Sequence, residues 1–173
     1  MNKKIENFIG GKFYKSQNNT ISIYNPQEGK IIADVVDSTN DDLDLAIKSA
    51  KSAYESWSKY TLKERAEVFY EFRNQLINNL DSLSKSIVDE NGKTLDEAKA
   101  EVLKGIELTE FACSIPQIIN DEIQEVSKGV ECRSSHESIG LVASIAPFNF
   151  PIMVPMWTIP NALILGNCMI FKP

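Results

Sequence analysis

The sequence predicts an α/β fold with three parts: a β-hairpin cap at the amino terminus, a group of helices, and the start of a parallel, Rossmann-like sheet. Three observations support this. Gly10-Gly11 separates two short runs typical of a hairpin. Helical periodicity with capping boxes fills the middle of the chain. A strand, helix and strand pattern over 140–173 predicts a βαβ unit, whose two strands are parallel.

Residues 1–36 are predicted to form the β cap. The segment 7–16 is expected to be a hairpin, because Gly10-Gly11 can adopt the positive φ angles of a two-residue turn. Alternating residues at 21–24 predict a strand, and a further strand is expected at 30–36, after Gly29.

Residues 37–119 are predicted to be helical. The first helix is expected to begin after Ser38 or Thr39, and a third is expected from about 81 to 90. Threonine followed three residues later by glutamate marks the start of the second and fourth helices, at Thr61 and Thr94. Pro116 is expected to end or bend the fourth helix.

Residues 120–139 are polar and contain short alternating runs, such as 131–134. Alternation of this kind is typical of a strand exposed on one face.

The segment 140–173 carries the strongest pattern in the chain. An apolar strand is expected at 141–146, buried on both faces, and a second at 168–171. A helix could begin at Pro151, and Gly166-Asn167 is a typical helix stop. Because ligands of such units bind at the carboxyl ends of the strands, 146–149 and 172–173 are the candidate site.

The net charge and the apolar runs of the sequence argue against two classes of binding partner, nucleic acids and membranes. The 173 residues carry a net charge of −6, which argues against nucleic acid or an anionic membrane. The apolar run at 151–165 is interrupted by prolines and too short to span a bilayer, so no membrane partner is expected. Three irregularly spaced cysteines indicate a reducing compartment, for which the cytoplasm is the simplest interpretation.

Several kinds of site are excluded by their motifs. The sequence has no G-x-G-x-x-G and no phosphate-binding P-loop. One histidine and no C-x-x-C give no metal site, and His136 is expected at the surface. Cys113 and Cys168 lie in apolar patterns, where a free cysteine is usually a small hydrophobic residue. None of the three cysteines is expected to be catalytic.

Asn149 and Lys172 remain as chemical groups at the predicted strand ends. The Asn149 carboxamide could donate two N–H groups to a ligand or could simply close its own turn. The Lys172 ammonium could reach two neighbouring oxygens or could be a solvated charge. The residues alone do not separate these alternatives.

The motifs at these positions resemble the aldehyde dehydrogenase superfamily. APFNFP at 146–151 and GNCMIFKP at 166–173 resemble its turn and strand motifs. Phe148, the run at 105–119 and MVPMW at 153–157 are most similar to its CoA-acylating methylmalonate-semialdehyde (malonate-semialdehyde) branch.

The resemblance implies roles for individual residues. Asn149 matches the family's oxyanion-hole asparagine, and Lys172 matches the lysine that donates to the adenosine ribose of NAD. Ala146, Pro147 and Phe148 would line the nicotinamide side. NAD is the implied cofactor and coenzyme A the implied co-substrate. The substrate would be a small semialdehyde, either methylmalonate or malonate semialdehyde.

The resemblance also implies a division of the chain. Residues 1–36 would be the amino-terminal cap, 37–119 the helical part of the NAD-binding domain, 120–139 an oligomerisation segment, and 140–173 the first βαβ unit of the cofactor sheet. The full-length enzyme would be a homo-oligomer, a dimer or tetramer.

Family chains are longer, so this chain is expected to correspond to an amino-terminal third. The nucleophilic cysteine and general-base glutamate of the family match no residue here, and the isolated chain is therefore expected to be inactive. A non-catalytic remnant, or an assembly partner of a dehydrogenase, is the alternative interpretation.

Overall fold

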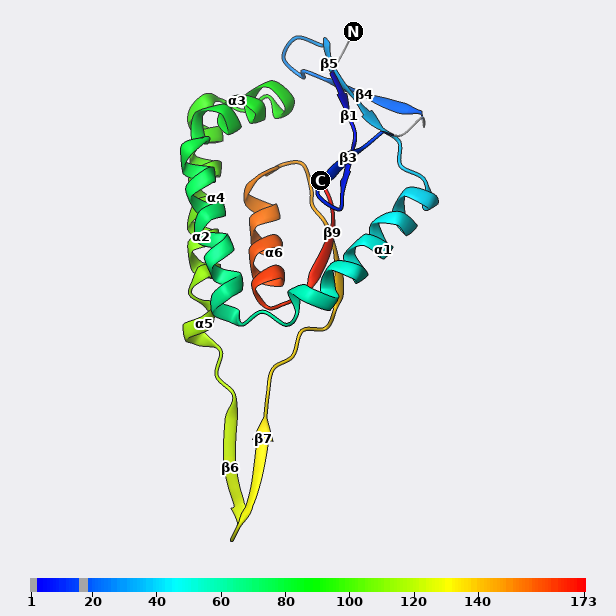
Figure 1. Ribbon diagram of the computed structural model, residues 1–173. Coiled ribbons are helices and arrows are strands. Elements are labelled where there is room, and N and C mark those ends of the chain that lie inside the picture. The colour runs from blue at the N-terminus through cyan, green and yellow to red at the C-terminus, as the bar shows by residue number, and fades with distance from the viewer. Residues whose placement is uncertain (1–2, 16–18) are drawn as a thin grey trace.

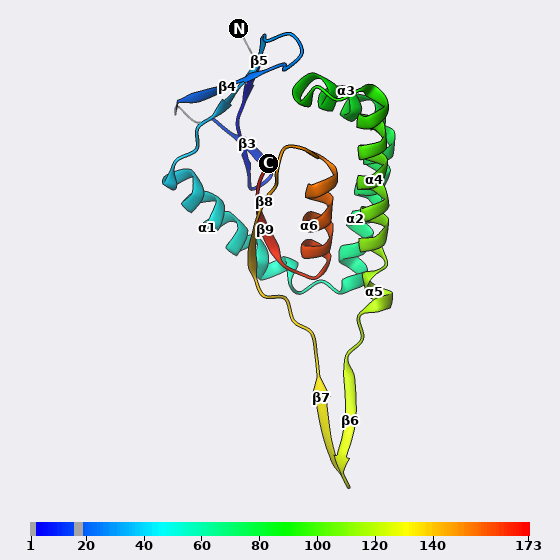
Figure 2. The ribbon, with the colours of Figure 1, turned by 180° about the vertical axis from the view of Figure 1, so that it is seen from behind.

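A computed structural model describes residues 3–15 and 19–173. Helices α2 and α4 lie side by side, α6 lies between them and the short sheet β8–β9, and α1 lies against the other side of that sheet (Figures 1 and 2). The helices are α1 (Asn40–Trp57), α2 (Leu62–Asn78), α3 (Leu80–Asn91), α4 (Leu95–Cys113), α5 (Ile115–Ile118) and α6 (Met153–Ile164). The predicted α/β class is confirmed.

The amino-terminal part forms two small sheets. The hairpin β2 (Asn7–Ile9) and β3 (Lys12–Tyr14) turns at Gly10 and Gly11, with φ angles of 58° and 76°. This confirms the predicted hairpin, except that its expected end at residue 16 lies outside the described residues. In the second sheet, β5 (Ile31–Val36) pairs with β4 (Thr20–Tyr24) and, in parallel, with β1 (Lys3–Ile5).

The predicted helix boundaries agree with the structure to within a residue or two. Thr39, rather than Ser38, is the residue before α1. Thr61 and Thr94 form capping boxes with Glu64 and Glu97, and each box joins the two side chains and their backbone N–H groups. These bonds satisfy N–H groups that a helix start would otherwise leave without partners. Pro116 lies at the start of the short helix α5, which follows α4 directly.

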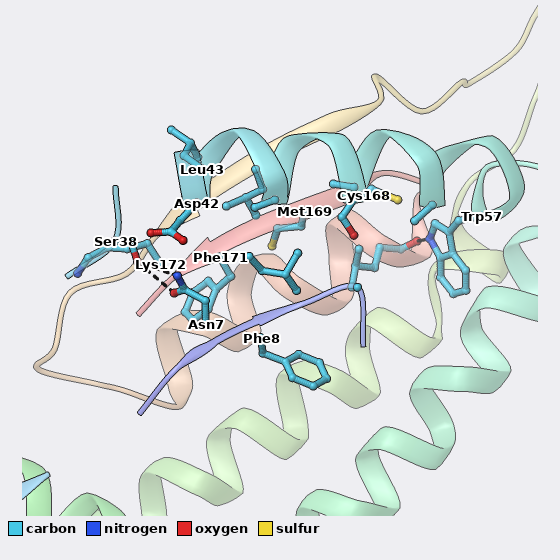
Figure 3. Close-up of a pocket in the computed structure, with 18 of the residues that line it drawn as sticks. Asn7, Phe8, Ser38, Asp42, Leu43, Trp57, Cys168, Met169, Phe171 and Lys172 are labelled. Carbon is cyan, nitrogen blue, oxygen red and sulfur yellow. Dashed lines mark hydrogen bonds between the residues drawn. The ribbon is translucent and has the colours of Figure 1, made fainter. Parts of the chain in front are cut away.

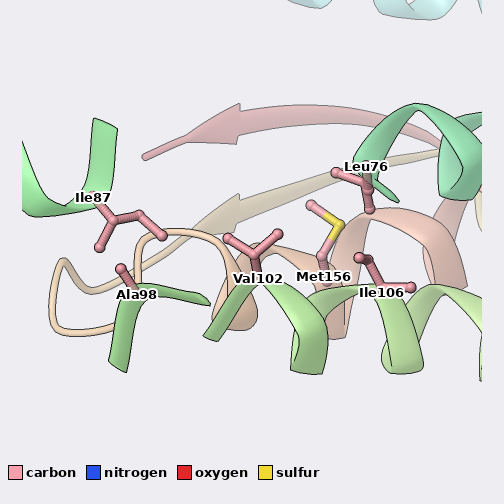
Figure 4. Close-up of a cluster of buried hydrophobic side chains, with 6 residues drawn as sticks. All are labelled: Leu76, Ile87, Ala98, Val102, Ile106 and Met156. Carbon is pink, nitrogen blue, oxygen red and sulfur yellow. The ribbon is translucent and has the colours of Figure 1, made fainter. Parts of the chain in front are cut away.

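The main core lies where α4 meets α2, α3 and α6. Its buried members are Leu76, Ile87, Ala98, Val102, Ile106 and Met156 (Figure 4). Gly105 lets α4 and α6 come close, because a Cβ atom there would lie 3.1 Å from Ile152 Cγ2 and 3.2 Å from Met156 Cγ. The core therefore fixes α6 against α4.

The segment 120–139 contains an antiparallel ribbon that projects from the body of the protein (Figures 1 and 2). Its strands are β6 (Glu122–Ser127) and β7 (Val130–Ser134), and all of their residues are exposed. The expectation of one covered face is therefore wrong. No other element among the described residues packs on the ribbon.

The predicted βαβ unit is present. Strands β8 (Leu141–Ile145) and β9 (Cys168–Lys172) are parallel, and the register runs from Leu141 opposite Cys168 to Ile145 opposite Lys172. Gly166, with a φ angle of 91°, follows the end of α6. Helix α6 begins at Met153, two residues after Pro151, because residues 151–152 form a turn.

Strand β8 is not buried on both faces as expected. Ile145 is 78% exposed, and β8 and β9 pair only with each other within the described residues. Among these residues, no helix is both long enough and apolar enough to cross a membrane.

Candidate active site

The candidate site residues leave the sheet at the same edge. Ala146 N–H donates to the carbonyl oxygen of Lys172 at 3.1 Å, which extends the parallel ladder by one bond beyond β8. The turn that begins at Ala146 and the side chain of Lys172 therefore emerge from the carboxyl ends of neighbouring parallel strands. In open α/β sheets this is the edge where ligands bind.

Two side chains from the α3–α4 corner anchor the turn. Asn91 Nδ2 donates to the carbonyl oxygen of Phe148 at 2.7 Å, and Lys93 Nζ donates to the carbonyl oxygen of Asn149 at 2.6 Å. The backbone on both sides of the Phe148–Asn149 peptide is thus held from outside the βαβ unit.

The Asn149 carboxamide is exposed and makes no hydrogen bond to the described part of the chain. No bond in this structure therefore supports the alternative that it closes its own turn. A carboxamide held on a fixed backbone can offer two N–H donors to an oxygen that gains negative charge.

Glu101 holds the segment that follows the turn. Its side chain is buried on α4, and Oε1 accepts hydrogen bonds from the backbone N–H groups of Ile152, at 2.8 Å, and Met153, at 3.2 Å. A carboxylate at this place stabilises the positive end of α6. Its other oxygen pairs with the Lys93 ammonium.

Sequence reasoning missed Asn91, Lys93 and Glu101. One signal could have found Glu101, since it shares the buried stripe of α4 with Ala98 and Val102. A carboxylate in such a stripe is rarely buried without a partner.

Lys172 lines a groove of about 660 Å³ between α1, β9 and the hairpin (Figure 3). Its exposed Nζ donates to the carbonyl oxygen of Pro173 at 2.7 Å. Lysine N–H donors at a strand end fit the ribose hydroxyls of a dinucleotide. The other groove walls are mostly apolar and include Phe8, Leu43, Trp57, Met169 and Phe171.

This groove does not include residues 146–149. The structure therefore brings Asn149 and Lys172 to one edge of the sheet but does not enclose them in one pocket formed by residues 3–15 and 19–173. Ala146 is half-buried at the sheet, whereas Pro147 and Phe148 are exposed.

Within the part of the chain that the structure describes, the cysteines and the histidine lie outside this edge. Cys113 and Cys168 are buried, and burial raises the pKa of both thiols. His136 is exposed, with Nδ1 3.6 Å from Asp121 Oδ1 near the base of the ribbon. Over the described ranges, no group of three or more metal-ligating side chains could hold a metal ion.

A parallel βαβ unit with a turn-held amide at one strand end and a lysine at the next is typical of ligand-binding α/β domains. Residues 13–173 match the model of the aldehyde dehydrogenase family, and the chain belongs to that family. This confirms the resemblance of the sequence motifs.

Among curated proteins, the chain is similar to malonate-semialdehyde dehydrogenases. It is 39% identical over 173 residues to that of Lacticaseibacillus casei, covering 99% of this chain and 35% of the relative. The identity to the Bacillus pumilus (strain SAFR-032) protein is 37% over 171 residues, covering 98% of this chain and 35% of the relative. The chain thus spans about a third of the length of these relatives.

The fold is also similar to those of solved dehydrogenase structures. A protein of Sinorhizobium meliloti 1021, described as a methylmalonate-semialdehyde dehydrogenase and complexed with NAD, superposes with a TM-score of 0.96 at 35% identity. It is covered to 36% of its length, with all of this chain included. The methylmalonate-semialdehyde dehydrogenase of Oceanimonas doudoroffii gives 0.96 at 32% identity, covering 99% of this chain and 35% of that one. The fold is that of the amino-terminal portion of an aldehyde dehydrogenase.

Proposed function

We propose that this chain supplies the oxyanion donor and part of the NAD site of a CoA-acylating dehydrogenase that acts on methylmalonate or malonate semialdehyde. The observation that carries the proposal is the anchored turn at the end of β8, which presents Asn149 at the same sheet edge as Lys172. The names of the similar proteins, and the NAD in one of them, support the choice of substrate and cofactor.

The proposed reaction converts the semialdehyde, CoA and NAD to an acyl-CoA, CO2 and NADH. NAD supplies the acceptor for the hydride that leaves the substrate carbon. Asn149 donates to the oxyanion that forms when a cysteine thiolate adds to the aldehyde. Lys172 donates to the ribose hydroxyls, and Ala146, Pro147 and Phe148 line the nicotinamide side and exclude water.

No described cysteine suits the role of that thiolate. Cys113 and Cys168 are buried, and Cys132 lies on the projecting ribbon, far from the strand ends (Figure 1). We therefore expect no turnover from the 173-residue chain alone. NADH formation by the purified chain with either semialdehyde, NAD and CoA would overturn this part of the proposal.

The proposal also assigns roles to the parts of the chain. Residues 1–36 form the cap, 37–119 and 140–173 belong to the cofactor domain, and 120–139 mediate assembly of a dimer or tetramer. The exposed apolar side chains of the ribbon, Ile123, Val126 and Val130, support the assembly role. Three free cysteines fit a cytoplasmic enzyme.

The test begins with the coding sequence beyond the codon for Pro173, followed by expression of the complete reading frame. Asn149→Ala is expected to lower kcat by about 10²–10³, because one oxyanion donor is lost. Lys172→Ala is expected to raise KM for NAD with a smaller effect on kcat. A stop codon directly after Pro173 would favour a remnant or an assembly partner instead. Unchanged kcat in Asn149→Ala would overturn the proposed role of Asn149 as the oxyanion donor.

A further inference from the structure

The Lys93 ammonium contacts three groups from different parts of the chain: a backbone carbonyl, a carboxylate and an aromatic ring. It donates to the carbonyl oxygen of Asn149 at 2.6 Å, pairs with Glu101 Oε2, and lies 4.0 Å from the centroid of the Phe150 ring. Its side chain is only 16% exposed. A lysine fixed in this way loses much of its rotational freedom, and the groups that it binds are held together.

Glu101 links Lys93 to the backbone that follows the turn, at the start of α6. While Oε2 binds Lys93, Oε1 accepts the N–H groups of Ile152 and Met153. Its side chain is 1% exposed, so these bonds operate away from water, where they are strengthened. Gly105, one turn further along α4, allows the close helix contact that brings Glu101 to the start of α6.

These contacts surround Asn149 without touching its carboxamide. Because that side chain has no hydrogen bond within the described part of the chain, its position depends on the backbone at residues 148–153. The Lys93–Glu101 pair fixes both the carbonyl of Asn149 and the amides that follow it. Lys93 also neutralises the Glu101 carboxylate, so no unpaired negative charge opposes a nearby oxyanion.

We propose that Lys93 and Glu101 are positioning residues that hold Asn149 in place to stabilise the oxyanion, an inference that rests on the proposed function of Asn149. The pair acts through the backbone of the turn and contacts neither substrate nor cofactor. Its loss leaves the carboxamide present but displaced, and a displacement of about 1 Å is sufficient to lower a rate by about 10²-fold.

The first test is Lys93→Met in the protein encoded by the complete reading frame. Methionine retains an unbranched chain of similar length and removes the ammonium. The expected result is a kcat lower by about 10- to 100-fold, with KM for NAD changed less than about twofold. Lys104→Met is the matched control, because Lys104 lies on the exposed face of α4 and, among residues 3–15 and 19–173, pairs only with Glu107, at 2.7 Å. It should leave kcat unchanged.

A double-mutant cycle separates positioning from general support of the fold. If Lys93 acts through Asn149, Lys93→Met should lower kcat little further in an Asn149→Ala background. An additive loss would overturn the positioning role. Lys93→Arg keeps the charge and the N–H donors and should therefore recover part of the rate. If Lys93→Met folds poorly, the double-mutant cycle is measured with Lys93→Arg.

Hydrogen exchange tests the network without turnover. Glu101→Ala should speed exchange at the Ile152 and Met153 amides, whereas Glu101→Gln, which keeps an acceptor oxygen, should retain part of their protection. Unchanged exchange in Glu101→Ala would overturn the inference. Normal kcat in Asn149→Ala would instead overturn the proposed function, so the two failures are distinguishable.

Discussion

The three cysteines occupy two kinds of environment. Cys113 ends α4 among buried residues that include Phe69 and Ile164. Cys168 is buried at the start of β9, whereas Cys132 is exposed on β7. Burial raises the pKa of the Cys113 thiol, an effect that Arg73 partly opposes, and burial alone raises that of Cys168. Since the thiolate is the nucleophile, the two buried thiols should be inert.

We therefore expect iodoacetamide at about pH 7.5 to label Cys132 first, because Cys132 is exposed whereas Cys113 and Cys168 are buried. Labelling of Cys113 and Cys168 should require denaturant or a higher pH. Mass spectrometry of peptides after timed labelling gives the three rates. Rapid modification of Cys113 in the folded protein would contradict its assignment as a core residue.

The capping boxes of α2 and α4 make the stability of the folded protein depend on pH. The Thr61 backbone N–H, and then the Thr61 hydroxyl, lower the pKa of Glu64 below its ordinary 4.5. The Thr94 hydroxyl, and then its backbone N–H, do the same for Glu97. A carboxylate whose pKa is lowered on folding stabilises the native state above its unfolded pKa. That contribution is lost as pH falls through the folded pKa.

Replacement of both glutamates with glutamine should remove this pH dependence while keeping an acceptor at each position. The difference in free energy of unfolding between wild type and Glu64→Gln/Glu97→Gln should be largest near neutral pH and shrink below pH 4.5. Urea unfolding at several pH values measures it. Glu122→Gln, at an exposed position on β6 of the projecting ribbon, is the matched control.

Local signals explain which elements could be predicted. Thr61 and Thr94 lie three residues from their capping partners, and Gly10-Gly11 and Gly166 supply positive φ angles within a turn, so the sequence contains each boundary. The parallel pairing of β1 with β5 joins residues about thirty positions apart, as in Lys3 opposite Ala33, and no local pattern specifies it.

The support of the site was missed for the same reason. Lys93 and Asn149 lie 56 residues apart, and Glu101 and Ile152 lie 51 apart. Arg65 is a further case, since its buried guanidinium donates to the carbonyl oxygen of Ile164 at 2.6 Å across 99 residues. Motifs located the candidate site at one edge of the sheet, but only the packed structure identifies the side chains that hold it.

At the scale of the whole molecule, the ribbon has apolar residues that nothing in the described chain covers. Ile123, Val126 and Val130 are each more than half exposed on strands that project from the body. Its alternating residues were predicted to have one covered face, and a second subunit would provide that cover. A projecting two-stranded ribbon has little stability of its own, so a partner surface would also stabilise its strands.

The last prediction concerns this assembly. Ile123→Lys/Val130→Lys in the product of the complete reading frame should convert the proposed oligomer to smaller species, because two charges would have to lose water in an apolar contact. Sedimentation velocity over a range of protein concentrations measures the change. Val68→Lys, at an exposed position on α2, is the matched control and should leave the oligomer intact. If the ribbon variant sediments as the wild type does, the contact lies elsewhere. If both variants dissociate, added charge rather than the ribbon is responsible.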